Sequence, residues 1–341
     1  MHSVIKIRGN EIKLFFCFLA VLCHLTRLDG QSNKPDSIQN IFYSSLKNKL
    51  TIYLYGTSRF NEFDIKKSGQ STGISYKPNE NFNLGLGFTY KWIGLSAAFS
   101  FKFINNDDIK NGKTQSFGAG FDLYGKRIIW SGSLQTYKGY YWSNAENFNT
   151  NGITVNPVYI RPDINSVNIS LSSLFSFNHD KFSFKAVFAD NEWQRKSAGS
   201  LLFGGYVSLF GISADSSLVP FTLKNKYQEF DSILALNSFN FGYTLGYTYT
   251  LIIKHHFYVN AALLIGLSLQ TIALYNLDDI AFLSESNISG KINLRFGIGY
   301  NSENYYFGIS MINESYFINK DTNSQFTYNY GKIRLVYGRR F

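Results

Sequence analysis

The stretch FNLGLGFTYKW, residues 82–92, decides the fold because it alternates strictly between two kinds of side chain. Large apolar side chains occupy every second position: Phe82, Leu84, Leu86, Phe88, Tyr90 and Trp92. Small or polar residues lie between them: Asn83, Gly85, Gly87, Thr89 and Lys91. Successive side chains of a β-strand point to opposite faces, so the pattern predicts a strand with one apolar and one polar face.

The same alternation recurs along most of the chain. SFNFGYTLGYTYTL (238–251) alternates without exception, and NISGKINLRFGIGY (287–300) repeats the pattern. Thirteen segments are candidate strands: 50–58, 82–92, 94–103, 116–124, 127–137, 165–177, 182–190, 199–213, 238–251, 256–270, 287–300, 304–314 and 325–341. Most reach ten residues, whereas ordinary strands average about five or six and tilted membrane-crossing strands need about nine to eleven.

The composition agrees with an all-β protein. Aromatic residues make up 18% of the chain and charged residues 16%, with 24 Tyr and 32 Phe against 5 Pro. After residue 30 there is no run of eighteen apolar residues, so no transmembrane helix is expected. Short links at 91–94, 123–127, 178–181, 253–256 and 301–304 alternate with longer polar connections at 104–114, 138–163, 214–236, 270–286 and 314–324. Short turns at one rim and long loops at the other predict an antiparallel, up-and-down transmembrane β-barrel.

An odd number of strands does not suit such a barrel, because both chain ends then lie at opposite rims. One candidate is therefore false, or one strand is missed. The weakly alternating region 182–213 and the segment 71–78 are the places where the error is expected. The prediction is twelve strands, with fourteen as the alternative.

The first thirty residues have the pattern of a secretory signal. Lys6, Arg8 and Lys13 precede the apolar run LFFCFLAVLCHL (14–25), which is too short to span a bilayer. The predicted division is a signal peptide at 1–30, an N-terminal periplasmic segment at 31–48 and an outer-membrane barrel at 49–341. Cys17 and Cys23 both lie in the signal, so neither disulfides nor a cysteine metal site is expected in the mature chain. Leu22 argues against a lipoprotein signal at Cys23.

The formal net charge of +10 does not by itself identify a partner. Export makes nucleic acid an unsuitable partner, and the Lys and Arg residues are dispersed along the chain. Solvated surface charge and attraction to anionic lipid headgroups both agree with this distribution. The expected partners are outer-membrane lipid and the barrel assembly machinery, and the oligomeric state is not predicted.

Alternation alone does not separate a membrane barrel from a soluble β-sandwich. Tyr and Trp lie near segment ends, where an interfacial girdle is expected: Tyr53, Tyr55, Tyr90, Trp92, Tyr247, Tyr249, Tyr328, Tyr330 and Tyr337. The opposite face is rich in Gly and Ser, which fit the inside of a narrow cylinder. The hairpins also follow one another without a helix, which favours a closed barrel with no unpaired edge in lipid.

The chain ends in YGKIRLVYGRRF, with Phe341 as its last residue. Ile333, Leu335, Tyr337 and Phe341 share one face and resemble the C-terminal signal by which outer-membrane barrels are recognised for assembly. The alternative is a strand that happens to end in Phe. Phe326, Tyr328 and Tyr330 have the opposite parity, which predicts a bulge near Gly331.

No catalytic constellation or cofactor site is predicted, so the chain is not expected to be an enzyme. Only His179, His255 and His256 remain after the signal, all in predicted turns, and no G-x-S-x-G occurs. A metal site at the His pair would need further ligands, and a solvated turn is the alternative. The GLG, GAG and GIG triplets lack the third glycine and the helix of a phosphate loop.

Charges on the predicted inner face are the candidate site residues: Lys102, Asp122, Lys185, Lys291, Arg295 and Arg334. They fit either a selectivity patch in a channel or ion pairs that fill a narrow interior. The long connection 137–163 is rich in aromatics and Asn, which suits binding of sugars or peptides and equally a loop folded over the barrel mouth.

Four stretches resemble the domain of unknown function 4421 family: YKPNENFNLGLGFTYKWIGL (76–95), YKGYY (137–141), IRPD (160–163) and NEWQRKSAG (191–199). The resemblance covers nearly all of the mature chain. It implies an exported outer-membrane barrel of Bacteroidota without an assigned activity, and it carries no ligand or catalytic residues.

Three functions remain open from the sequence. The leading hypothesis is an outer-membrane β-barrel with a structural, adhesive or small-solute channel role. The second is an outer-membrane hydrolase acting on lipid or peptide, which the scarcity of histidine disfavours. The third is a soluble periplasmic lipid-binding barrel, whose aromatic faces would point inward around a ligand.

Overall fold

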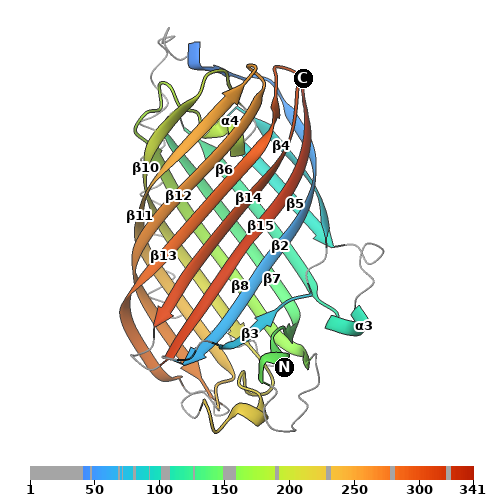
Figure 1. Cartoon of the computed structure of the whole chain (residues 1–341), viewed down its shortest axis with the longest axis vertical. Coiled ribbons are helices and arrows are strands. Elements are labelled where there is room, and N and C mark those ends of the chain that lie inside the picture. Colours follow the sequence, from blue (N-terminus) through green and yellow to red (C-terminus); the bar gives the residue numbers. More distant parts are fainter. Residues whose placement is uncertain are drawn as a thin grey trace.

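The chain forms a closed barrel of twelve antiparallel strands, as the sequence predicts (Figure 1). The computed structural model describes residues 41–46, 48–67, 70, 72–79, 82–91, 93–100, 108–125, 127–148, 159–188, 192–227, 232–276, 281–319 and 324–341. In ring order the strands are β2 (Thr51–Lys67), β4 (Asn83–Tyr90), β5 (Ile93–Ser100), β6 (Gln115–Tyr124), β7 (Ile128–Trp142), β8 (Tyr159–Ser176), β10 (Ala198–Ser213), β11 (Ala235–Ile253), β12 (Phe257–Tyr275), β13 (Ala281–Asn301), β14 (Tyr305–Asn319) and β15 (Ser324–Arg340).

Pairing of the last strand with the first closes the ring. β15 pairs with β2 along its whole length, from Arg340 opposite Thr51 to Ser324 opposite Lys67. Backbone hydrogen bonds between Leu50 and Phe341 extend the pairing by one residue. Both ends of the barrel segment therefore lie at one rim, the terminal rim, which is uppermost in Figure 1. The opposite rim carries the longer connections and is called the loop rim.

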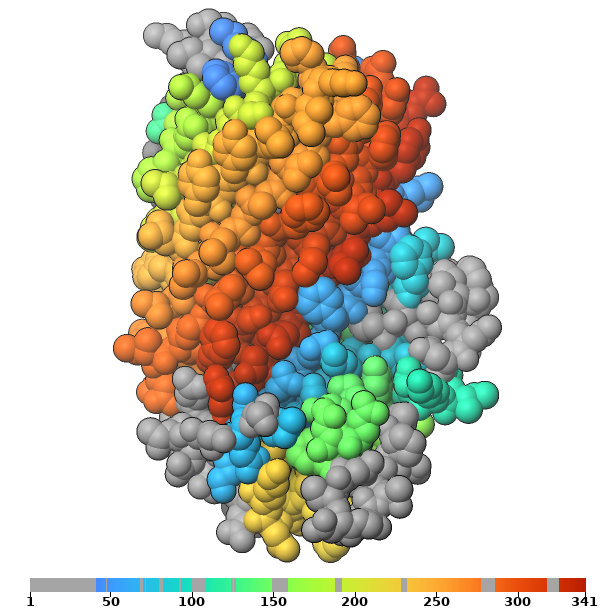
Figure 2. Space-filling model, in the orientation of Figure 1, coloured from blue at the N-terminus to red at the C-terminus, as the bar shows by residue number. Residues whose placement is uncertain are grey.

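The alternation of the sequence separates the two faces of the wall. On β12 the outward side chains Leu263, Ile265, Leu267 and Leu269 are 48–66% exposed, whereas the inward positions between them are buried. Strand β4 shows the same division of faces, since Leu84, Leu86 and Phe88 face outward. Side chains of β11 to β15 cover the visible face of the barrel as tilted bands (Figure 2).

The false strand candidate is 182–190. Residues 177–188 and 192–197, here called the inner segment, enter the barrel at the terminal rim instead of forming a hairpin through the link at 178–181. The segment contains α4 (Lys185–Phe188) and β9 (Glu192–Gln194), and β9 pairs with β1 (Tyr43–Ser45). Phe182 and Phe184 are buried against inward residues of the wall. Two buried residues spaced by two look like one face of a strand in the sequence, although here both side chains simply enter the same core.

The segment 71–78 also lies outside the ring of twelve. It contains β3 (Ile74–Lys77), which pairs with β2 on one side and β7 on the other. β3 bridges these two strands on the loop-rim side of β4, β5 and β6, which are only 8 to 10 residues long. The remaining elements are α3 (Asp108–Asn111), η3 (Ala145–Phe148) and η4 (Phe221–Leu223). In the described part of the chain, no helix is long and apolar enough to cross a membrane.

The predicted bulge near Gly331 is wrong. β15 keeps an uninterrupted register with both β14 and β2. Phe326, Tyr328 and Tyr330 point into the barrel while Ile333 and Leu335 point out, so the aromatic side chains change face without any slip of the backbone. Arg339 shares the outward face with Tyr337 and Phe341, so one cation interrupts the apolar residues at the end of this face.

Four residues of the predicted girdle face inward instead. Tyr53, Tyr55, Tyr328 and Tyr330 are at most 8% exposed and point into the interior. Tyr90, Tyr247, Tyr249 and Tyr337 do lie on the outer face, and Trp92 lies outside the described residues. Parity distinguishes the two groups, since Tyr53 and Tyr55 alternate along the strand with the exposed Ile52 and Leu54.

A large apolar cluster, the loop-rim core, fills the barrel near the loop rim. It comprises Phe63, Ile65, Ile74, Tyr76, Tyr137, Tyr140, Trp142, Ala145, Phe148, Ile164, Tyr206, Phe210, Ile212, Leu218, Val219, Tyr227, Ile233, Leu236, Ile272, Leu274, Tyr316, Phe326, Tyr328 and Tyr330. Tyr137, Tyr140 and Trp142, from the connection predicted at 137–163, belong instead to the wall strand β7 and point into this core, and η3 adds Ala145 and Phe148. Buried side chains therefore fill the barrel near both rims, those of the loop-rim core at one and those around the inner segment at the other.

Candidate functional site

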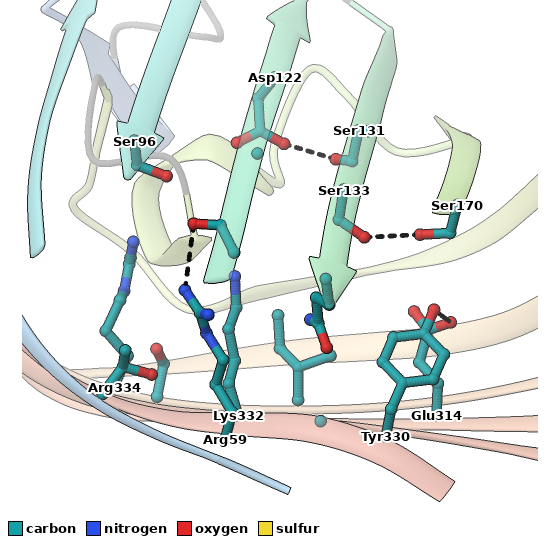
Figure 3. Close-up of a pocket in the computed structure, with 18 of the residues that line it drawn as sticks. Arg59, Ser96, Asp122, Ser131, Ser133, Ser170, Glu314, Tyr330, Lys332 and Arg334 are labelled. Atoms are coloured by element: carbon teal, nitrogen blue, oxygen red, sulfur yellow. Dashed lines mark hydrogen bonds between the residues drawn. The ribbon is translucent and has the colours of Figure 1, made fainter. Parts of the chain in front are cut away.

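The interior between the two closed ends holds a polar cavity of about 160 Å³, here called the chamber. One water occupies about 30 Å³ in the liquid, so the chamber has room for several waters or a small solute. Its wall combines charged side chains from β2, β13, β14 and β15 with serines and glycines from β5, β6, β7 and β8. The two groups face each other across the cavity (Figure 3).

Three of the six predicted lumen charges line the chamber: Asp122, Arg295 and Arg334. Lys291 points into the barrel beside them but is buried in a side-chain network. Lys185 lies in α4 of the inner segment, where its Nζ is 3.4 Å from a Glu192 carboxylate oxygen. Lys102 lies outside the described residues.

Sequence reasoning missed three charged residues of the chamber: Arg59, Glu314 and Lys332. Arg59 lies just beyond the predicted end of the strand 50–58, which the structure extends to Lys67. Lys332 follows the bulge that was predicted at Gly331. If alternation is continued without interruption through 51–67 and 324–340, Arg59 and Lys332 are both assigned to the inner face.

Positive charge gathers on one wall. Arg59, Lys332 and Arg334 rise side by side from β2 and β15 toward the opposite wall (Figure 3). Lys332 is the direct cross-strand partner of Arg59, and both side chains face inward. Arg59 as a whole is 6% exposed, and its Nη2 donates to the carbonyl oxygen of Gly118 at 3.3 Å. Like charges directly opposite on one face of a sheet destabilise the pairing.

The opposite wall presents hydroxyl groups. The Ser131 hydroxyl donates to the Asp122 carboxylate at 2.6 Å, and the Ser133 and Ser170 hydroxyls lie 2.7 Å apart. Ser96 and Ser172 also line the cavity. Gly118 and Gly120 of β6 leave this wall without side chains, and the missing Cβ of Gly118 makes room for the Arg59 guanidinium, whose Nη1 would lie 2.1 Å from it.

A network around Glu314 separates the chamber from the loop-rim core. The Glu314 carboxylate is 2.6 Å from Lys291 Nζ and accepts hydrogen bonds from Asn293 Nδ2 at 2.8 Å and the Tyr330 hydroxyl at 2.6 Å. The Lys291 ammonium also lies over the rings of Tyr206 and Tyr316, 4.2 and 4.8 Å from their centroids. Burying these two charges costs solvation free energy, and the hydrogen bonds and aromatic contacts of the network help to offset that cost.

The inner segment separates the chamber from the terminal rim. Phe184 and Ile129 line the chamber and also a smaller cavity of about 20 Å³ on the terminal-rim side. The Arg295 guanidinium lies 5.2 Å from the centroid of the Phe184 ring. A single layer of side chains therefore stands between the two cavities.

Two buried amides anchor the inner segment. Gln194 Nε2 donates to the carbonyl oxygens of Lys181 at 2.7 Å and Lys196 at 2.9 Å, and its Oε1 accepts from the Ser183 backbone amide. Asn301 Nδ2 donates to the carbonyl oxygens of Ala186 and Glu192. Gln194 thus holds the irregular backbone of the segment together from within, and Asn301 joins the segment to the wall strand β13.

The three histidines lie away from the chamber. His255 and His256 form the turn between β11 and β12, where the His256 ring stacks on Trp193 with centroids 4.9 Å apart. His179 lies in the inner segment, with its Nε2 3.2 Å from Asp180. Among the described residues, no group of three or more His, Cys, Asp or Glu is placed to hold a metal ion.

The C-terminal residues predicted to serve as an assembly signal lie on the outer face. Ile333, Leu335, Tyr337 and Phe341 are 45–63% exposed. They form one apolar stripe at the end of β15, beside the seam that closes the barrel.

These features define the class: a twelve-stranded antiparallel β-barrel with an apolar outer face and a cationic interior chamber between two clusters of buried side chains. The chain belongs to the family described as domain of unknown function (DUF4421), whose model matches residues 34–341. This confirms the family predicted from the sequence. No curated protein matches the sequence.

Solved structures of outer-membrane barrels are similar to this chain. The outer membrane protease OmpT from Escherichia coli is 10% identical with a TM-score of 0.35, covering 87% of this chain and 98% of that one. The translocator domain of the autotransporter NalP from Neisseria meningitidis is 11% identical with a TM-score of 0.35, covering 96% and 98%. The P. putida toluene transporter TodX is 7% identical with a TM-score of 0.27, covering 86% and 90%. Likenesses this low assign no activity to this chain.

Proposed function

We propose that the protein is an integral outer-membrane β-barrel with a closed interior, serving a structural or adhesive role rather than acting as a permanently open pore. The observation that carries the membrane location is the outward apolar face. From Phe257 to Leu269 it spans twelve residue steps on β12, about 30 Å along the barrel axis at roughly 3.3 Å per step and a tilt of about 40°. That height matches a bilayer's hydrocarbon layer of about 30 Å.

The direction of the two faces weighs against a soluble lipid-binding barrel. Such a barrel would point its apolar stripe inward around the ligand. Here Phe241 and Leu294 lie on the outer face, whereas Thr244 and Asn293 are buried inside. The position of both barrel ends at one rim also agrees with an even-stranded barrel whose termini lie in the periplasm.

Two fractionation experiments test the location. After carbonate washing, an integral barrel stays in the membrane pellet, whereas a soluble protein leaves it. On an SDS gel, a closed barrel migrates differently before and after boiling. Lipid-soluble quenchers should then reach fluorophores at Phe241 and Leu294 and spare those at Thr244 and Asn293; the reverse pattern would reject the proposal.

Export and assembly follow from the same proposal. The signal peptide at 1–30 and the recognition of Ile333, Leu335, Tyr337 and Phe341 by the assembly machinery are parts of it. Deletion of Phe341 should leave unassembled, protease-sensitive chain in the periplasm. If the truncated chain inserts into the membrane normally, Phe341 is not part of the assembly signal.

Gated passage of a small solute is the second candidate, and the chamber favours it. A solute in the chamber is separated from the terminal rim by the layer that contains Phe184 and Ile129. Planar-bilayer recording tests the choice. The unmodified protein should show no steady conductance if it is closed, and brief openings would favour gating.

A hydrolase receives no support from the geometry. The chamber lining contains no histidine, and His255 and His256 lie in a turn at the rim. Release of labelled phospholipid or peptide by the refolded protein would revive this alternative. Loss of that release on substitution of His179, His255 and His256 would locate the site.

A further inference from the structure

We propose that the chamber is a binding site for a small phosphoryl oxyanion, held between the cationic wall of β2 and β15 and the serine wall of β7 and β8. The proposal goes beyond the structural role above. It requires the closed interior of the barrel but not its location in a membrane.

Positive charge is in excess in and around the chamber. Five cationic side chains lie in or beside the chamber: Arg59, Lys291, Arg295, Lys332 and Arg334. Two carboxylates, Asp122 and Glu314, accompany them, so the formal excess is five minus two, or three positive charges. Away from bulk water such an excess is costly unless an anion compensates it.

Two of these cations, Arg59 and Lys332, line the cavity without a carboxylate at ion-pair distance among the described residues, and Asp122 acts on Lys332 only from farther away. Arg59 Nη1 is also buried without a hydrogen-bond partner. Lys332 and Arg59 are direct cross-strand neighbours on the same face. An oxyanion between them converts a repulsive pair into two charge-assisted contacts.

The chemical groups of the two walls suit a phosphoryl oxyanion. Guanidinium groups offer paired donors that match phosphoryl oxygens, and serine hydroxyls supply further donors without charge. Asp122 lies among these serines and accepts a hydrogen bond from Ser131. A hydrogen phosphate carries an O–H that can donate to this carboxylate, whereas sulfate at neutral pH carries none. The wall therefore favours phosphate over sulfate.

The size and enclosure of the site set the ligand class. A cavity of about 160 Å³ admits inorganic phosphate or a small phosphoryl compound but no phospholipid. The layer containing Phe184 and Ile129 closes the terminal-rim side. Exchange of the anion consequently needs movement of the inner segment, and binding should be slow or should require the anion during refolding.

The test uses the full chain refolded in detergent micelles, with the gel-mobility shift as the check that each variant forms a barrel. Inorganic phosphate, sulfate and chloride are added at matched ionic strength, during refolding and afterwards, and binding is measured by calorimetry and by thermal unfolding. Phosphate should raise the unfolding midpoint saturably and more than sulfate does. Lys332→Gln and Arg59→Gln should each weaken phosphate binding by about tenfold or more, which corresponds to about 1.4 kcal/mol or more.

The matched controls decide the interpretation. Lys66→Gln removes a cation from the same strand β2 but from its outer face, and should leave phosphate binding unchanged. Lys332→Arg keeps the cation and should retain phosphate binding. If Lys332→Gln loses binding but still shows the gel-mobility shift of a folded barrel, the loss is due to the missing charge and not to misfolding. Absence of any saturable phosphate effect, or equal losses in Lys332→Gln and Lys66→Gln, would overturn the proposal. A protein that binds phosphate but leaves the carbonate-washed pellet would refute the membrane location alone.

Discussion

Lys291 and Glu314 form an ion pair inside the barrel, with 2.6 Å between the ammonium nitrogen and a carboxylate oxygen. Asn293, two residues along β13 from Lys291, is the direct cross-strand partner of Glu314 and donates to the same carboxylate. The pair forms the floor between the polar chamber and the loop-rim core, because Tyr206, Tyr316 and Tyr330 of that core contact it.

Removing one partner of this pair should destabilise the barrel strongly. Glu314→Gln leaves the Lys291 ammonium buried without its counter-charge, for which a loss of roughly 3–5 kcal/mol is expected. Lys291→Met combined with Glu314→Gln should restore much of the loss, since no buried charge then lacks a partner. Urea unfolding in detergent micelles, followed by tryptophan fluorescence, measures both. Equal losses in the single and double variants would show that the pair does not act as a unit.

The glycines of the LGLG stretch should be needed for the inward tyrosines. A Cβ at Gly85 would lie 2.2 Å from the ring of Tyr55, which is its direct cross-strand partner. Gly85→Ala should therefore destabilise by about 1–3 kcal/mol through overpacking. Gly120→Ala is the control, because its nearest atom is a backbone oxygen at 3.3 Å. The same unfolding assay ranks the two, and a larger effect at Gly120 would contradict the packing explanation.

The outer face should reject charge in proportion to depth in the bilayer. Leu263 lies midway between Phe257 and Leu269 on the outward stripe of β12 and is 48% exposed, whereas Phe257 begins the strand at the terminal rim. Leu263→Arg should lower the unfolding free energy in lipid vesicles by about 2–4 kcal/mol, and Phe257→Arg by about 0–1 kcal/mol. Similar values for the two variants would mean that this face does not meet hydrocarbon.

Truncating the layer at the terminal-rim side should open the chamber. Phe184→Ala removes the ring that lines both interior cavities and contacts Arg295. Because the loop-rim core still fills the other end, the chamber should become open to the terminal rim without forming a conducting pore. A water-soluble thiol reagent should therefore label Ser133→Cys, in the chamber wall, faster in Phe184→Ala than in the otherwise unmodified protein. Phe177→Ala, at a residue of the same segment that is 57% exposed, should leave the labelling rate unchanged. Equal labelling rates in all three proteins would place the barrier elsewhere.

The outer face and the number of strands were predictable from the sequence. A period of two over ten or more residues has one geometric solution, because a one-residue slip would move every apolar side chain to the wrong face. Residues 82–91 and 238–251 therefore reveal their outward positions by alternation alone. The family was likewise recognisable from local stretches of the chain.

The inside of the barrel was predictable only in part. Alternation assigned Asp122, Lys291, Arg295 and Arg334 to the inner face, but it gave no sign that Arg59 lies opposite Lys332. That contact depends on closure of the ring between strands about 270 residues apart in the chain. The inward turn of Tyr53 and Tyr55 was missed because an aromatic residue near a strand end fits a girdle and an interior equally well.

The sequence by itself determined which positions share a face, since strand geometry alone fixes that relation. Only the tertiary structure decided that 182–188 enters the barrel instead of crossing the wall, because two phenylalanines spaced by two fit a strand and a plug alike. It also decided that the ends are closed and that the cations meet in one chamber. These outcomes depend on side chains brought together by ring closure, and local alternation carries no information about partners so distant in the chain.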